Sequence, residues 1–157
     1  MRSFKSFTLP VLIFGLGMTT GASAQEAPAN GTAQADERRA IVLQPGERAM
    51  ILAEMRQFLA GVQAITAAAA REDATAIAAA ARPLGLKAAQ EVPAPLRAKL
   101  PKDFKQFGFS VHSEFDQLAA DAEALGDIRH SMTQLSGVLQ KCVSCHAMFR
   151  LENEPAK

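Results

Sequence analysis

Apolar side chains recur every three or four positions across the last quarter of the chain, and this spacing constrains the fold more than any other feature. Intervals of four and three residues alternate through one series: Ile128, Met132, Leu135, Leu139, Cys142, His146 and Phe149. Such intervals place side chains on one face of an α-helix. The series therefore predicts a long C-terminal helix whose buried face includes a cysteine and a histidine.

Three earlier stretches also have helical patterns, at about residues 45–70, 73–91 and 102–125. In the third, the expected inner face runs through Phe104, Phe107, Val111, Phe115, Leu118, Ala122 and Leu125. The first two are rich in alanine, the best helix former. The connections are short or modest, so we expect an all-α antiparallel four-helix bundle over residues 41–157, with a ligand held by the last helix.

Proline and glycine mark the breaks between these stretches. Pro83 should kink or split the second stretch, because proline removes a helical hydrogen bond. Pro93, Pro95 and Pro101 predict an irregular connection, and the pair at 126–127 reads as a helix stop followed by an N-cap.

The first 24 residues read as a secretory signal peptide. Arg2 and Lys5 form a basic start, an apolar stretch of about ten residues follows, and small residues end at Ala24. That stretch is well short of the ~20 residues that span a bilayer. We expect cleavage after Ala24, a periplasmic product with no membrane span, and a mobile tail over residues 25–40.

Charge gives no support for nucleic-acid binding. Without Arg2 and Lys5, the 17 basic residues of the whole chain become 15, against 16 acidic ones. A nucleic-acid-binding domain is instead expected to carry a basic patch.

The only two cysteines belong to a C-x-x-C-H motif at residues 142–146. This is the attachment signature of c-type haem. Each sulfur forms a thioether with one haem vinyl group, and the histidine ligates the iron. On a helix, Cys142, Cys145 and His146 lie within one arc and can face one flat porphyrin. The motif predicts one covalent haem c, with His146 as the axial iron ligand.

Three other chemistries use such a pair. A thioredoxin-like redox pair needs a βαβ setting, which the sequence does not show. A closed zinc site needs a fourth ligand, for which only His112 and His130 are at hand. A plain disulfide leaves the position of His146 unexplained. We expect His112 and His130 to be surface or half-buried side chains rather than ligands.

A c-type motif near the C-terminus, on the last of four helices and followed by Phe149 and Arg150, resembles the cytochrome c′ family. The resemblance covers about residues 41–152, and only the last helix is specific. It implies that Arg48 approaches a haem propionate, that Leu52 covers the distal haem face, and that Arg150 lies near the proximal face. Ala49 departs from the Gln that often follows the Arg in this family.

The distal residue decides between two functions. Under Leu52 the iron is five-coordinate and open to small gases such as NO or CO. A methionine ligand would instead make a six-coordinate, low-spin electron carrier, and Met55 is the alternative, with Met50 nearby. We favour the open site, because the resemblance puts Leu52 at the family's distal position and Met55 is nearly one turn away from it.

Electron transfer with redox partner proteins is the expected function, and gas binding is the alternative. No acid–base pair or nucleophile arrangement indicates an enzyme. The resemblance further implies pairing of two copies through the alanine-rich first and second helices.

Overall fold

The computed structural model describes residues 35–155, and these residues fold mostly into helices. The expected signal peptide and most of the expected tail lie outside the described residues. None of the helices within residues 35–155 has the length and apolarity needed to cross a membrane.

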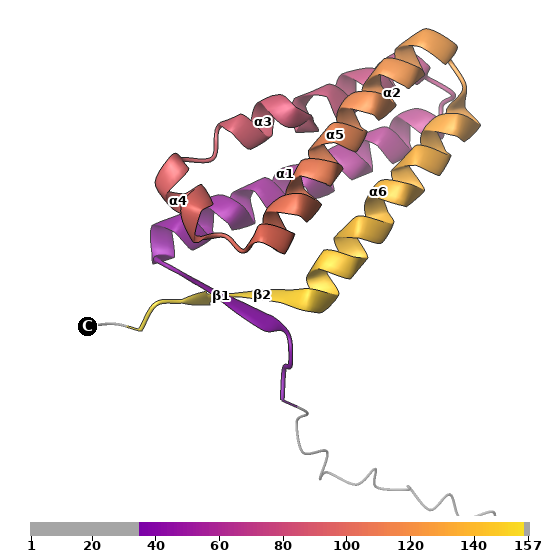
Figure 1. The fold of residues 1–157 in the computed structure, drawn as a ribbon. Helices are drawn as coiled ribbons and strands as arrows, with labels where there is room; N and C mark the ends of the chain where they lie inside the picture. The colour runs from indigo at the N-terminus through magenta and orange to yellow at the C-terminus, as the bar shows by residue number, and fades with distance from the viewer. Residues whose placement is uncertain (1–34, 156–157) are drawn as a thin grey trace, which may run out of the picture. The chain divides into compact units, whose positions relative to one another are not determined.

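Long helices α1, α5 and α6 run beside the shorter α2 and its continuation (Figure 1). Helix α2 packs against α1 and α5, and α5 packs against α6. Short turns reverse the chain between α1 and α2 and between α5 and α6. The elements in chain order are β1 (Arg39–Leu43), α1 (Pro45–Ala69), α2 (Ala74–Ala81), η1 (Arg82–Leu84), α3 (Leu86–Gln90), α4 (Ala94–Lys99), α5 (Lys102–Leu125), α6 (Ile128–Met148) and β2 (Phe149–Asn153).

The helix ends agree with the breaks expected from the sequence. Pro83 lies in the 3₁₀ turn η1, which splits the second stretch into α2 and α3. Gly126 ends α5 with φ of 63°, a left-handed conformation that glycine adopts without steric cost. The Asp127 carboxylate accepts from the His130 amide at 3.0 Å and caps α6.

Two expectations about irregular segments were wrong. The connection containing Pro93 and Pro95 includes helix α4, because these prolines lie before and within its first turn, where no backbone donor is lost. Arg39, placed in the expected tail, begins strand β1. That strand pairs in parallel with β2, from Arg39 opposite Phe149 to Leu43 opposite Asn153.

The larger core lies among α1, α2, α5 and α6. Alanines of α2 and α5 let these helices approach closely around larger buried side chains such as Phe115, Leu118 and Leu135. Phe115 and Phe58 stack with ring centroids 5.6 Å apart. This core holds the helices together along most of their length.

A second core lies beneath the two-stranded sheet. Ile41 and Leu43 of β1 point inward, and Val42 between them is 46% exposed, as strand alternation requires. They pack with Ile51 of α1 and with Phe149 of β2. Helix α4 completes this core with Leu96, followed by Leu100.

The buried face of α6 differs from the expected series at two positions. Leu139 is 40% exposed, and fully buried Val138 takes its place toward the core. His146 is also exposed. The face turns because α6 packs mainly on α5, so the stripe Ser131, Leu135, Val138 and Cys142 follows the α5 contact.

Two leucines of α5 give a matched test of the larger core. Leu118 is fully buried and Leu125 is 63% exposed. We expect Leu118→Ala to lower the free energy of unfolding by about 2–5 kcal/mol, because it leaves a cavity. Leu125→Ala should change it by less than about 0.5 kcal/mol. Urea unfolding followed by circular dichroism measures both, and equal effects would contradict this core.

Candidate functional site

A cavity of about 300 Å³ lies between the two cores. Helices α1, α5 and α6 form most of its wall, and β2 closes one side. The wall is largely apolar, with several charged side chains. The residues that the sequence assigns to the site all line it: Arg48, Leu52, Met55, Cys142, Cys145, His146 and Arg150.

Helix α6 presents both cysteines to this cavity. Cys142 packs against the larger core and Cys145 against the second core, so the pair spans the boundary between the two. Both are free thiols and half-buried. Burial raises the pKa of both thiols, and the Glu114 charge adds to the rise at Cys142. The thiols therefore stay protonated near neutral pH.

These features bear on the alternative chemistries. Redox-active C-x-x-C pairs depend on a lowered thiol pKa, and here the shift has the opposite sign. Within residues 35–155, no three His, Cys, Asp or Glu side chains gather in an arrangement that could hold a metal ion.

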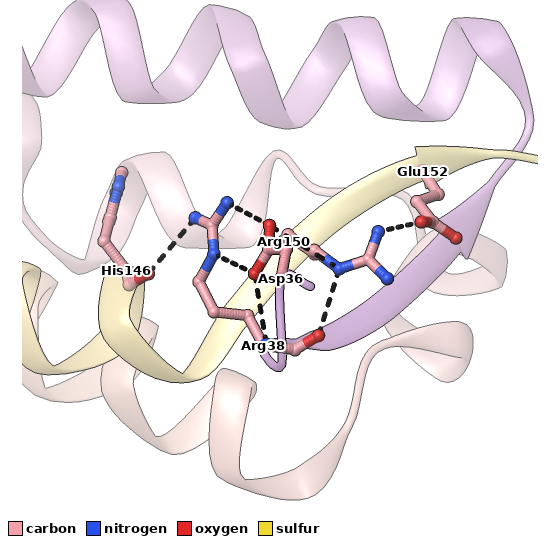
Figure 2. Close-up of polar contacts among 5 residues, drawn as sticks. All are labelled: Asp36, Arg38, His146, Arg150 and Glu152. Atoms are coloured by element: carbon pink, nitrogen blue, oxygen red, sulfur yellow. Dashed lines mark hydrogen bonds and ion pairs between the residues drawn. The ribbon is translucent and has the colours of Figure 1, made fainter. Parts of the chain in front are cut away.

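The backbone of His146 is held by the segment before α1. The Arg38 guanidinium donates to the His146 carbonyl oxygen at 3.3 Å (Figure 2). Arg38 also binds the Asp36 carboxylate through Nε at 2.9 Å and Nη2 at 2.6 Å. This hydrogen-bonded pairing lowers the pKa of Asp36 to about 2. Arg38 lines the cavity as well.

Arg150 of β2 bonds in turn to the backbone of Arg38. Its Nε donates to the Arg38 carbonyl oxygen at 3.1 Å, and its Nη1 pairs with the Glu152 carboxylate (Figure 2). Arg150 thus borders the cavity near His146, with its Nε and Nη1 engaged by protein groups.

Arg48 is different, because its buried Nε has no hydrogen-bond partner within the described part of the chain. An unpaired buried donor is costly unless a ligand or water satisfies it. Arg48 lines the cavity one turn before Leu52, and Met55 lies beyond. Met50 is 46% exposed and does not line the cavity.

His112 is only 3% exposed, so the expected surface or half-buried position was wrong. Its Nδ1 lies 2.7 Å from the Leu84 carbonyl oxygen, and its Nε2 lies 3.4 Å from Glu54 Oε1. Phe58 packs on the ring with a centroid distance of 5.0 Å. These partners compensate for burying a polar ring in the wall of the cavity.

Several lining residues were not assigned to the site from the sequence. Phe104 and Phe107 were assigned only to an inner face, and that pattern does not separate a core from a cavity wall. Arg38 could not be assigned to the site from the sequence, because it lies just before β1 and belongs to no periodic pattern or motif.

Comparison with protein-family models, with curated proteins and with solved structures finds no match for this chain. Function is therefore inferred from the sequence motif and the geometry of the cavity.

The His112 pair predicts a pH-dependent stability. Burial lowers the pKa of His112, but the Glu54 carboxylate and the Leu84 carbonyl outweigh it, so the pKa is raised above 6.5. The stabilisation is present below the unfolded-state pKa and is lost as pH rises through the folded-state pKa. We expect His112→Gln to cost about 1–3 kcal/mol at pH 6 and less at pH 9.

Urea unfolding at the two pH values measures this difference. His130→Gln is the control, because His130 is an exposed partner of Asp121. A His112→Gln cost that does not change with pH would contradict the proposed charged pair.

Proposed function

We propose that this chain is an exported c-type cytochrome with one covalent haem, built as a four-helix bundle of the cytochrome c′ kind. The observation that carries the proposal is that Cys142, Cys145 and His146 meet Arg48, Leu52 and Arg150 around one cavity. The family resemblance had grouped these residues from α1, α6 and β2 on sequence alone.

The wall of the cavity suits such a group. Protonated cysteine thiols on one helix face match the attachment chemistry, in which each sulfur adds to a vinyl group. A mostly apolar wall with a few polar groups is typical of a cofactor site. When bound, haem would supply a one-electron iron couple.

Arg48 is the residue best placed to bind a haem propionate. Its unpaired buried Nε needs an acceptor, and a carboxylate gives a charge-assisted hydrogen bond. Arg150 and Arg38 are already engaged by carboxylates and carbonyls of the protein. This division supports Arg48 as the cofactor contact and the other two as structural supports.

On the distal side, Leu52 and Met55 both border the cavity and Met50 does not. We propose Leu52 as the covering residue, which leaves the iron five-coordinate. Met55 is the alternative sixth ligand. Electron transfer between periplasmic redox partners is the primary function, and binding of NO or CO is the second candidate that an open iron position supports. No enzymatic reaction is proposed, and two copies would pair through α1 and α2.

Alanine substitution tests haem attachment. The wild-type chain, exported from a strain that matures c-type cytochromes, should show a Soret band that survives denaturation. In the double variant Cys142→Ala with Cys145→Ala, no Soret band should survive denaturation, because both thioethers are lost and the haem is no longer covalently attached. Ser144→Ala, which removes a hydroxyl bonded to the Gln140 carbonyl, should keep it. A wild-type protein without a Soret band would reject the proposal.

Carbon monoxide tests the distal side. With Leu52 over the haem, CO should shift the ferrous Soret band of the wild type and of Met55→Leu alike. If Met55 ligates the iron, the wild type should be low-spin and resist CO, and only Met55→Leu should bind it readily. Ferrous spectra with and without CO distinguish the two.

A further inference from the structure

The segment at residues 36–43, called here the N-terminal strap, crosses the end of the helices beside β2 (Figure 1). Its strand part is held by the parallel ladder and by the buried Ile41 and Leu43. Its first residues lie next to the last turn of α6, where Arg38 reaches His146. The strap therefore joins the first residues that the structure describes to the residue expected to ligate the iron.

The Arg38 contact satisfies a backbone carbonyl at the C-terminal end of α6. The last four carbonyls of an α-helix lack intrahelical partners. Because α6 ends at Met148, the amide that would bond the His146 carbonyl belongs to Arg150, which is already in β2. The Arg38 guanidinium supplies the missing donor, and its positive charge suits a helix C-terminus.

Arg38 and Arg150 hold the strap and β2 together reciprocally. The Arg38 side chain donates to the backbone at the end of α6, and the Arg150 side chain donates to the Arg38 backbone (Figure 2). Asp36 binds Arg38 through two nitrogens and lies 3.8 Å from Arg150. A lone ion pair as exposed as the one between Arg38 and Asp36 stabilises little. Because this pair is bidentate, however, it fixes the plane of the Arg38 guanidinium.

We propose that Arg38 is a positioning residue that fixes the His146 backbone and thereby the approach of its ring to the iron. This inference rests on the proposed haem function. Asp36 orients Arg38, and the strap keeps it in place. The iron–histidine bond then depends on a residue more than a hundred positions away in the sequence.

Arg38→Gln tests the inference in the full chain. The variant loses the positive charge and the bidentate guanidinium but keeps a polar side chain. We expect amide hydrogen exchange at the C-terminal end of α6 and its cap, residues 146–149, to rise about tenfold, because the charge-assisted hydrogen bond from Arg38 to the His146 carbonyl is lost there. In the haem-loaded ferrous protein, the iron–histidine stretching band in the resonance Raman spectrum should move to lower frequency.

Two further variants sharpen the result. Glu37→Gln changes a neighbouring exposed charge that does not line the cavity, and should leave both signals unchanged. Arg38→Lys keeps the positive charge without the bidentate guanidinium, so both signals should lie between those of the wild type and of Arg38→Gln. If Arg38→Gln leaves both signals at wild-type values, the inference is wrong. Equal acceleration of exchange in α5 would show general destabilisation and would also reject it.

The two proposals fail separately. A chain without a Soret band rejects the haem function, while amide exchange in that same sample still reports whether Arg38 holds the end of α6. A normal Soret band with an unchanged iron–histidine band and unchanged exchange rejects only the role of Arg38.

Discussion

The burial of Phe149 at the junction of α6 and β2 is the interaction on which the rest of the structure depends. Its ring meets Phe104 of α5 edge-to-face at 5.6 Å, and the Arg39 guanidinium lies 4.5 Å from its centroid. Phe149 is 5% exposed and belongs to the second core. Because the chain turns from helix to strand here, β2 can pair with β1 and the two cores stay separate.

The separation of the cores produces the cavity. Cys142 contacts one core and Cys145 the other, so the motif lies where neither core fills the space. The charged side chains around this space divide into two kinds. Arg38 and Arg150 are occupied by Asp36, Glu152 and backbone carbonyls, whereas Arg48 keeps a buried donor that no group within residues 35–155 pairs with. This difference is the basis for proposing Arg48, and not the other two, as a ligand contact.

Sequence patterns predicted the helices well, because each depends on local signals. Pro83, Gly126 and Asp127 act within one turn of their own positions, and the structure confirms the breaks that they predict. The patterns failed where long-range packing decides. Strand β1 has three consecutive apolar residues, Ile41 to Leu43, so its sequence shows no polar–apolar alternation, and the strand exists through pairing with β2. The burial of His112 depends on Glu54 and Leu84 from other segments.

The sequence by itself determined the helical class, the ends of the long helices and the C-x-x-C-H motif, because spacing along the chain encodes each of them. The resemblance also grouped Arg48, Leu52 and Arg150 with the motif. Only the tertiary structure decided that they surround one cavity, that Met50 lies outside it, and that Arg38 supports His146. The physical reason is distance along the chain, since such contacts form only after the helices pack and leave no periodic trace in the sequence.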